Sequence, residues 1–221
     1  MTTFRVCEIF GSIDGEGLRT GELTTFIRLA GCNLRCSYCD TCYALKLTDG
    51  EEMTLGEVLE RVKDIGYKNI TVTGGEPLIH RNIAVLINKL CLEGYNVNIE
   101  TNGAVEIWPY LDYENVVLTM DYKSASSGEE SKMKLQNLEQ LREQDVLKFV
   151  VEESDLEKVE YLLKNYKIKS YIYLSPVFEK INPARLVEFL KELHEKGYDT
   201  KKIRVQVQLH KIIWNSNKRG V

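Results

Sequence analysis

Residues 24–42 read TTFIRLAGCNLRCSYCDTC, an apolar segment that runs directly into a loop with four cysteines. The first six residues are rich in β-branched, aromatic and aliphatic side chains, which predicts a strand. The loop holds Cys32, Cys36 and Cys39 in a C-x3-C-x2-C arrangement, and Cys42 follows three residues later. Thiolates at such spacings can wrap an iron–sulfur cube or a zinc ion. The stretch therefore predicts a metal-binding loop at the end of a strand.

The cysteine spacing alone leaves several interpretations open. A structural zinc site takes four ligands, so Cys42 would supply the fourth thiolate. The same four cysteines would also close an ordinary electron-transfer cluster. If only three of them bind, a four-iron cluster keeps one iron open for a ligand that chelates through an amine and a carboxylate. Unligated thiols are the remaining alternative.

Outward from this loop, short apolar strands alternate with amphipathic helices. We predict strands at 4–10, 24–29, 69–73, 96–100, 116–121, 146–151, 171–175 and 203–209. We predict helices at 55–65, 82–93, 155–165 and 183–195. The cap signals at the helix starts are Thr54 with Glu57, Ser154 with Glu157, and Asn182 with Pro183.

This alternation predicts an α/β fold in which parallel strands are joined by right-handed crossovers. A closed eight-fold barrel typically takes about 250 residues, whereas this chain has 221 and must accommodate a long loop. We therefore expect one domain over 1–221: a partial, open TIM-like barrel of about six βα units, with an N-terminal extension at 1–23 and a cluster loop at 31–53. The functional site of such a fold lies at the carboxyl ends of the strands.

Composition narrows the class of partner and the compartment. Hydrophobic residues make up 43% and charged residues 28%, as in ordinary globular proteins. The net charge of −4 argues against a nucleic-acid partner, because such affinity comes from neutralised phosphates. No apolar run has the length of a signal peptide or of a membrane span, so we expect a cytoplasmic protein with no membrane partner. Six cysteines in such a protein are thiols or metal ligands rather than disulfides.

Polar motifs follow several predicted strands and converge on one edge of the sheet. After 69–73 comes Gly74-Gly75-Glu76-Pro77, whose glycines would let backbone approach a ligand and whose Glu76 would accept from an ammonium group. Arg28 lies in an otherwise apolar strand, so its guanidinium needs an anion: a substrate carboxylate, or an internal salt bridge to Glu8 or Glu16. His210 would bind substrate or a backbone carbonyl.

The cysteine loop followed by Thr73-Gly74-Gly75-Glu76-Pro77 resembles the radical S-adenosylmethionine superfamily. The resemblance implies a partial barrel of the radical SAM type, in which Cys32, Cys36 and Cys39 bind a [4Fe-4S] cluster. The fourth iron of that cluster would hold the methionine moiety of S-adenosylmethionine. Cys42 would then be a bystander, and Cys7 and Cys91 would be core thiols.

Five separated motifs resemble the 7-carboxy-7-deazaguanine synthase family: residues 8–17, 26–32, Cys39-Asp40-Thr41, 100–103 and His210-Lys211. The resemblance implies a lyase that converts 6-carboxy-5,6,7,8-tetrahydropterin to 7-carboxy-7-deazaguanine and ammonia in queuosine biosynthesis. It also implies Mg2+, an electron donor such as flavodoxin or ferredoxin, and a homodimer. The alternative function is a glycyl-radical-enzyme activase acting on a protein partner. Activases share a similar cysteine loop but do not need Gly15-Glu16-Gly17 or Thr41.

The same resemblance implies a set of site residues. Thr41 would bind Mg2+ through its hydroxyl oxygen. The residues around S-adenosylmethionine would be Tyr38, Asp40, Gly75, Asp121, Tyr122, Lys123, Ser175, Pro176 and Val177. The residues around the substrate would be Ile13, Asp14, Gly15, Glu16, Arg28, Thr73 and His210. Two positions depart from the family pattern: Asp14 replaces a usual glutamine, and Asp121-Tyr122 replaces a common Ser-Pro.

Overall fold

The computed structural model of the chain describes residues 2–216 and 218–221, and residue 1 of the predicted extension and residue 217 lie outside them. The described residues form a nine-stranded sheet in the order β3-β1-β2-β4-β5-β6-β7-β8-β9. The strands are β1 Thr3–Ile13, β2 Leu23–Leu29, β3 Glu51–Thr54, β4 Asn69–Gly74, β5 Asn96–Thr101, β6 Val116–Tyr122, β7 Val146–Val151, β8 Tyr171–Pro176 and β9 Ile203–Val205.

Six consecutive pairings, from β2–β4 to β8–β9, are parallel. Within this parallel run the strands follow one another in chain order from β2 through β4 to β9 without a reversal, which is the arrangement of a barrel rather than of a doubly wound sheet. β9 and β3 stand at opposite edges and do not pair among the described residues, so the barrel is open. The predicted partial barrel of about six units is confirmed.

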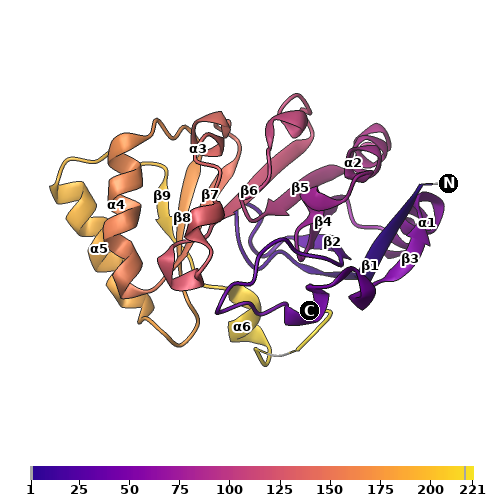
Figure 1. Ribbon diagram of the computed structural model, residues 1–221, viewed down its shortest axis with the longest axis horizontal. Helices are drawn as coiled ribbons and strands as arrows, with labels where there is room; N and C mark the ends of the chain where they lie inside the picture. Colours follow the sequence, from indigo (N-terminus) through magenta and orange to yellow (C-terminus); the bar gives the residue numbers. More distant parts are fainter. Residues whose placement is uncertain (1, 217) are drawn as a thin grey trace.

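The helices are α1 Leu55–Ile65, α2 Ile83–Leu92, α3 Asn137–Gln140, α4 Leu156–Asn165, α5 Pro183–Glu195 and α6 Leu209–Ile213. Figure 1 shows α1 and α2 along one end of the fan of strands, α4 and α5 along the other, and α6 apart from them. No helix of the described part of the chain is long and apolar enough to cross a membrane.

The two faces of the sheet differ in chemistry. Alternate strand residues such as Ile70, Ile99 and Phe149 are buried in the apolar core with side chains of α1, α2, α4 and α5. The intervening residues point to the opposite face, as the period of two requires, and include buried Asn98 and Lys148. We call this second surface the inner face; its buried polar side chains make it suited to a polar ligand.

Two of the three predicted helix caps are confirmed. The Thr54 backbone N–H donates to the Glu57 carboxylate at 2.7 Å, and Asn182 Oδ1 accepts from the Ala184 N–H at 3.0 Å. The cap at Ser154 is wrong. A 3-10 turn at Glu153–Asp155 precedes α4, and Asp155 instead receives the Glu152 N–H at 2.9 Å. The buried Asp155 also accepts from Ser126, and this tertiary contact sets the start of the helix.

The N- and C-terminal thirds contain further differences from the predicted elements. β1 is antiparallel to both neighbours, and β3 occupies the end of the predicted loop 31–53. The predicted strand 203–209 ends at Val205. The next residue, Gln206, still donates its backbone N–H to Leu174 O at 2.9 Å, while its side chain accepts from the Gly17 N–H at 2.7 Å and donates to Thr20 at 2.7 Å. His210 consequently lies in α6 rather than at a strand end. The apolar–polar alternation of this segment is overridden by tertiary contacts.

Candidate active site

The cysteine loop is fixed at its base by backbone contacts with the end of β4. The Gly31 N–H donates to Ala44 O at 2.8 Å, and the Glu76 N–H donates to Gly31 O at 2.8 Å. A Cβ atom on Gly75 would lie 2.3 Å from Gly31 O, and one on Gly74 would lie 2.2 Å from Leu29 O. The paired glycines are thus needed for the close contact of the end of β4 with Leu29 and with the cysteine loop. From the sequence they were predicted only to let backbone approach a ligand.

We expect Gly75→Ala to lower the free energy of unfolding by about 3 kcal/mol, because the added methyl overlaps backbone that cannot move aside cheaply. Gly56→Ala is the matched control: its Cβ would meet its nearest neighbour at 3.9 Å within α1, and helix propensity favours alanine by up to about 1 kcal/mol. Urea titration of both variants measures the difference. Equal stability of the two variants would contradict this role of Gly75.

The thiols of Cys32, Cys36 and Cys39 are half-buried within this loop. Cys32 Sγ accepts from the Leu34 N–H at 3.4 Å. Burial raises the pKa of all three thiols, to about 11 for Cys39. They will therefore bind as thiolates only when a metal supplies positive charge. Three soft thiolates on a short loop fit an iron–sulfur cluster.

The fourth cysteine differs from the other three in exposure. Cys42 is exposed, and its Sγ donates to Cys39 O at 3.0 Å. Across residues 2–216 and 218–221, no group of three histidine, cysteine or acidic side chains is gathered so as to hold a single metal ion. Cys7 and Cys91 are partly buried rather than fully enclosed in the core.

The segment after β6 holds the cysteine loop from the other side. Glu129 Oε1 accepts from the Arg35 N–H at 2.5 Å. The Ser37 N–H donates to Ser127 O at 3.0 Å, and its hydroxyl donates to Ser126 O at 2.6 Å. Glu129 and these serines are not predictable from the sequence, since nothing in residues 124–130 resembles a motif. They become visible only when the strand order brings this loop beside residues 32–39.

Glu76 is fully buried and connects the ends of β4 and β5. Its carboxylate accepts from the Asn102 N–H at 2.6 Å, the Thr101 hydroxyl at 2.8 Å and the Leu78 N–H at 3.0 Å. The expectation that this carboxylate faces an ammonium group of a ligand is therefore corrected. Its three donors all come from the chain, and they join the GGEP loop to the Thr101-Asn102 loop.

A chain of ion pairs crosses the inner face. Lys148 Nζ lies 3.0 Å from Glu16 Oε2 and 3.3 Å from Asp121 Oδ2, and Lys123 Nζ lies 2.9 Å from Asp121 Oδ2. Burial alone would lower the pKa of Lys148, but the Glu16 and Asp121 carboxylates raise it well above its usual value. Lys148 is 7% exposed and was missed in the sequence. Its signal was a lone lysine in the apolar strand VLKFVV.

The residues predicted around S-adenosylmethionine fall into two groups. Tyr38, Asp121 and Lys123 come together: Lys123 Nζ lies 5.7 Å above the Tyr38 ring, and Asp121 pairs with Lys123. Asp40 pairs with Lys211 at 2.9 Å and accepts from the Thr41 hydroxyl at 3.0 Å.

The second group leaves less room for side-chain contact with a cofactor. Tyr122 is buried in the outer core against Phe149, with ring centroids 5.5 Å apart, so only its backbone can face the site. Gly75 can contribute only backbone as well. The remaining residues, Ser175, Pro176 and Val177, are buried at the end of β8.

The residues predicted around the substrate lie on the inner face and its amino end. Asp14 follows Ile13 at the end of β1 and accepts from the Thr71 hydroxyl at 2.9 Å. Gly15 O accepts from the Leu209 N–H at 3.1 Å, and a Cβ on Gly15 would lie 2.5 Å from His210 Nδ1. The structure thus brings His210 against the Gly15-Glu16 segment, although these residues are far apart in the sequence.

Arg28 forms the internal salt bridge that was one of its two predicted outcomes. Its Nε lies 2.7 Å from Glu8 Oε1, and the Tyr43 hydroxyl donates to the same oxygen at 2.9 Å. Arg28 is paired in register with Thr73 on β4, which places both side chains on the inner face. The two terminal nitrogens of Arg28 have no hydrogen bond among the described residues, so a carboxylate can still reach them.

Several buried polar atoms of this region lack a partner. Among the described residues, no hydrogen bond reaches Asp14 Oδ2, Glu16 Oε1, Asp121 Oδ1 or Ser175 Oγ. A buried unsatisfied polar atom costs about 1–3 kcal/mol. Four such atoms on residues of one candidate site indicate that this surface is built to meet a polar ligand.

Asp14 should give the protein a measurable pH dependence. Burial, with the Glu100 carboxylate, raises the pKa of Asp14 to about 7. The folded state then binds a proton between about pH 4 and 7 that the unfolded chain has lost, so this group destabilises the fold progressively as pH rises through that window. We expect Asp14→Asn to gain stability relative to wild type, by about 2 kcal/mol between pH 5 and 8.

Urea titrations of both proteins across that pH range measure this gain. Comparing the difference between the two proteins removes the opposing contribution of His80 and His210, whose pKa values are lowered by burial. A difference that stays constant with pH, or that shrinks, would contradict the assignment to Asp14.

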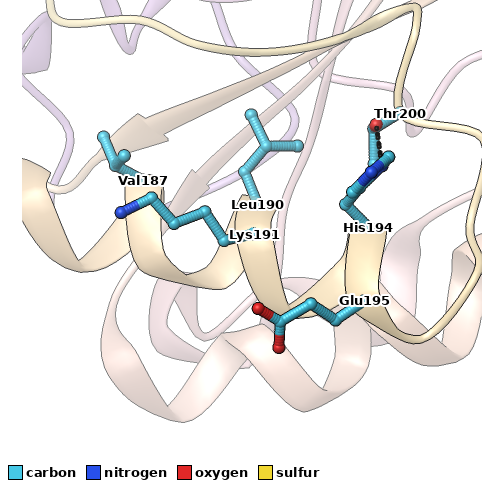
Figure 2. A pocket seen from close by; sticks show the side chains of 6 residues that line it. All are labelled: Val187, Leu190, Lys191, His194, Glu195 and Thr200. Carbon is cyan, nitrogen blue, oxygen red and sulfur yellow. Dashed lines mark hydrogen bonds between the residues drawn. The ribbon is translucent and has the colours of Figure 1, made fainter.

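One depression of the described surface is unrelated to these residues. It measures about 340 Å³ and lies along α5, with walls of Val187, Leu190 and Lys191 and a hydrogen-bonded pair of His194 and Thr200 at 3.3 Å (Figure 2). Figure 1 shows α5 at one end of the sheet, beside α4. None of the residues that line this depression belongs to the candidate site.

Comparison with known proteins decides the family. Residues 26–193 match the model of the Radical SAM superfamily. The chain is 45% identical to the 7-carboxy-7-deazaguanine synthase of Clostridium acetobutylicum, over 99% of each chain. It belongs to the 7-carboxy-7-deazaguanine synthase family of radical SAM proteins. The synthase of Leptospira interrogans is 35% identical over 98% of this chain and 97% of its own length.

The fold agrees with this family. The crystal structure of QueE from Escherichia coli superimposes with a TM-score of 0.72, at 25% identity, over 94% of this chain and 95% of that chain. Family membership also favours a three-cysteine cluster over the alternatives that used Cys42. A radical SAM protein binds a [4Fe-4S] cluster and S-adenosylmethionine, and the cysteine loop is the part of this chain that fits them.

Proposed function

We propose that the chain is a radical SAM lyase that converts 6-carboxy-5,6,7,8-tetrahydropterin to 7-carboxy-7-deazaguanine and ammonia in queuosine biosynthesis. The observation that carries the proposal is the 45% identity to a named synthase over 99% of the chain. The polar inner face beside the three-cysteine loop supports it, because a pterin with a carboxylate needs many hydrogen-bonding and charged partners.

The chain would hold its cofactors at the carboxyl ends of the strands. Cys32, Cys36 and Cys39 would ligate the cluster, which together with S-adenosylmethionine would supply radical chemistry for the removal of a substrate hydrogen. Lys123 and Asp121 would fix the position of the S-adenosylmethionine, since their ion pair is buried and adjoins the cysteine loop. The other residues proposed to line it are Tyr38, Asp40, Gly75, Ser175, Pro176, Val177 and the backbone of Tyr122.

The substrate would lie on the inner face, between these residues and the amino end of the sheet. Arg28 would bind the substrate carboxylate through its two terminal nitrogens while Glu8 holds its Nε. Asp14, Glu16 and His210 would meet the polar atoms of the pterin ring. Ile13, Gly15 and Thr73 would complete the walls. The protein positions the reactants and excludes competing reactions rather than performing the ring chemistry itself.

The proposal includes Mg2+, with the Thr41 hydroxyl as a ligand. Thr41 and Asp40 lie directly after the cysteine loop and are joined by a 3.0 Å hydrogen bond, so they present hard oxygen atoms at its edge. A homodimer, an electron donor such as flavodoxin or ferredoxin, and a cytoplasmic location also belong to the proposal.

The decisive experiment is an anaerobic assay of the reconstituted protein with 6-carboxy-5,6,7,8-tetrahydropterin, S-adenosylmethionine and reductant, with and without Mg2+. We expect 7-carboxy-7-deazaguanine and ammonia in equal amounts, and slower formation without Mg2+. Cleavage of S-adenosylmethionine without either product would overturn the proposal and favour the activase alternative. No dependence on Mg2+ would remove Thr41 from the metal site.

A further inference from the structure

A shift in the pairing of β1 with β2 turns Glu8 toward the inner face. Between Val6 and Glu8, β1 contains one residue more than β2, and Glu8 then stands directly opposite Arg28. Val6 is buried in the apolar core, and the period of two would send Glu8 there as well. After the shift, Ile9 packs against the core instead. Such β-bulges redirect side chains and are frequent beside active sites.

Glu8 contacts Arg28 through a single pair of atoms. Arg28 Nε lies 2.7 Å from Glu8 Oε1, and nothing in the described part of the chain accepts a hydrogen bond from Nη1 or Nη2 of Arg28. A carboxylate beside a guanidinium often makes two parallel hydrogen bonds instead. The Arg28 side chain is 16% exposed, so a ligand can still touch it. The contact therefore leaves the terminal nitrogens for another anion.

Tyr43 accounts for this single contact. Its hydroxyl donates at 2.9 Å to Glu8 Oε1, the same oxygen that receives Arg28 Nε. A turn of the carboxylate that placed both of its oxygens on the guanidinium would break this geometry. Tyr43 lies in the 3-10 turn Cys42–Ala44, directly after the cysteine loop. Arg219, near the end of the chain, packs on its ring with Cζ 3.7 Å from the centroid.

Two aromatic rings also limit the movement of the Arg28 guanidinium. Arg28 Cζ lies 5.9 Å from the centroid of the Tyr43 ring and 6.0 Å from that of Phe10. Phe10 is in turn stacked on Phe26, with ring centroids 4.9 Å apart. Aromatic faces attract a guanidinium at such distances. The orientation of Arg28 is thus set by a hydrogen bond on Nε and by rings beside its plane.

We propose that Tyr43 is a positioning residue, which acts through Glu8 to keep both terminal nitrogens of Arg28 available for the carboxylate of the substrate. The inference rests on the proposed function, in which Arg28 binds that carboxylate. Without the Tyr43 hydroxyl, Glu8 would turn and contact Arg28 with both oxygens, so the substrate would lose one terminal nitrogen. Tyr43 therefore strengthens the preference of the site for a carboxylate over an uncharged group of similar shape.

This preference is measured by anaerobic calorimetric titration of the cluster-loaded protein with two probes, 6-carboxy-5,6,7,8-tetrahydropterin and its 6-carboxamide. We expect wild type to prefer the acid, and Tyr43→Phe to weaken binding of the acid about tenfold and of the amide less than about twofold. Tyr161→Phe is the matched control, because Tyr161 is 52% exposed on α4. Equal losses for both probes in Tyr43→Phe, or no loss, would overturn the positioning role.

A double-mutant cycle shows whether Tyr43 acts through Glu8. A glutamine side chain has one oxygen and cannot accept two parallel hydrogen bonds from a guanidinium. Adding Tyr43→Phe to Glu8→Gln should therefore change the affinity for the acid by less than about twofold. A loss as large as that in the wild-type background would overturn the proposal.

A further variant tests the neighbouring cation. Arg219→Gln removes the guanidinium stacked on Tyr43 but leaves the Tyr43 hydroxyl in place, so the preference for the acid should persist. If Arg219→Gln abolishes this preference while Tyr43→Phe keeps it, Arg219 is the anion-binding group and the proposal is overturned.

The turnover assay separates this inference from the proposed function. We expect Tyr43→Phe to raise KM about tenfold and to leave kcat within about twofold of wild type, because the hydroxyl acts on binding of the carboxylate. Product formation by wild type, with unchanged KM and kcat in Tyr43→Phe, would leave the lyase assignment standing and overturn the positioning role. A wild-type protein that binds neither probe and forms no product would overturn the proposed function and this inference with it.

Discussion

Cys36→Ala is expected to leave a folded protein that contains no iron–sulfur cluster and has no detectable turnover. Three thiolates hold the cluster, so removal of one leaves a second iron without a protein ligand. The loss of activity should exceed about 10³-fold, which corresponds to more than about 4 kcal/mol of barrier. Iron and sulfide analysis after anaerobic reconstitution, together with the turnover assay, measures both effects. Cys32→Ala and Cys39→Ala should behave alike.

Cys42→Ala is the matched control, because Cys42 is exposed and only three residues from Cys39. It should retain iron, sulfide and activity within about twofold of wild type. If instead Cys42→Ala loses its metal while Cys36→Ala keeps iron, the three-cysteine cluster is refuted. Zinc without iron in the wild-type protein would refute it as well.

Lys148→Met should be the most destabilising single change on the inner face. It removes the cation between Glu16 and Asp121, so Glu16 loses its counter-charge and Asp121 keeps only Lys123. Breaking a buried ion pair in this way typically costs about 3–5 kcal/mol. Chemical denaturation of the cluster-free protein measures this loss apart from any effect on the cofactor. Activity should fall too, because Glu16 and Asp121 belong to the proposed substrate and cofactor sites.

A second substitution tests whether charge rather than packing is responsible. In the double variant Lys148→Met with Glu16→Gln, the unpaired carboxylate of Glu16 is neutralised, so we expect part of the stability to return. Lys202→Met is a control for loss of a lysine, since Lys202 pairs with an 82% exposed Glu143 and surface pairs contribute about 0–1 kcal/mol. A Lys148→Met protein as stable as Lys202→Met would contradict the role of this network.

The sequence predicts the architecture well where local signals agree with the fold. The strand from 146 to 151 and the helix from 55 to 65 coincide with β7 and α1, since an apolar run and a capping box mark them without ambiguity. The prediction for 203–209 is wrong in its second half: the alternation is typical of a strand, but β9 ends at Val205 and the Gln206 side chain contacts residues 17 and 20. No local pattern records that contact.

The residues of the candidate site also divide into those with a local sequence signal and those without one. Cys32, Cys36 and Cys39 could be found because their spacing is itself the chemical signal. Lys148 carries a signal of the kind that singled out Arg28, a lone cation in an apolar strand. Glu129 carries none, because its role depends on which loop the sheet places beside residue 35. The sequence also does not show which groups Glu76 contacts, because two of its donors, Thr101 and Asn102, belong to the end of the next strand.

The base of the cysteine loop is held by main-chain contacts that involve no sulfur. Gly31, Cys32 and Glu76 form these contacts through backbone N–H groups to Ala44, Leu45 and Gly31. The chain can therefore mature in two stages, folding first and receiving iron and sulfide afterwards from whatever donor delivers them. Protein produced under iron starvation should then be folded and able to take up iron and sulfide, rather than misfolded.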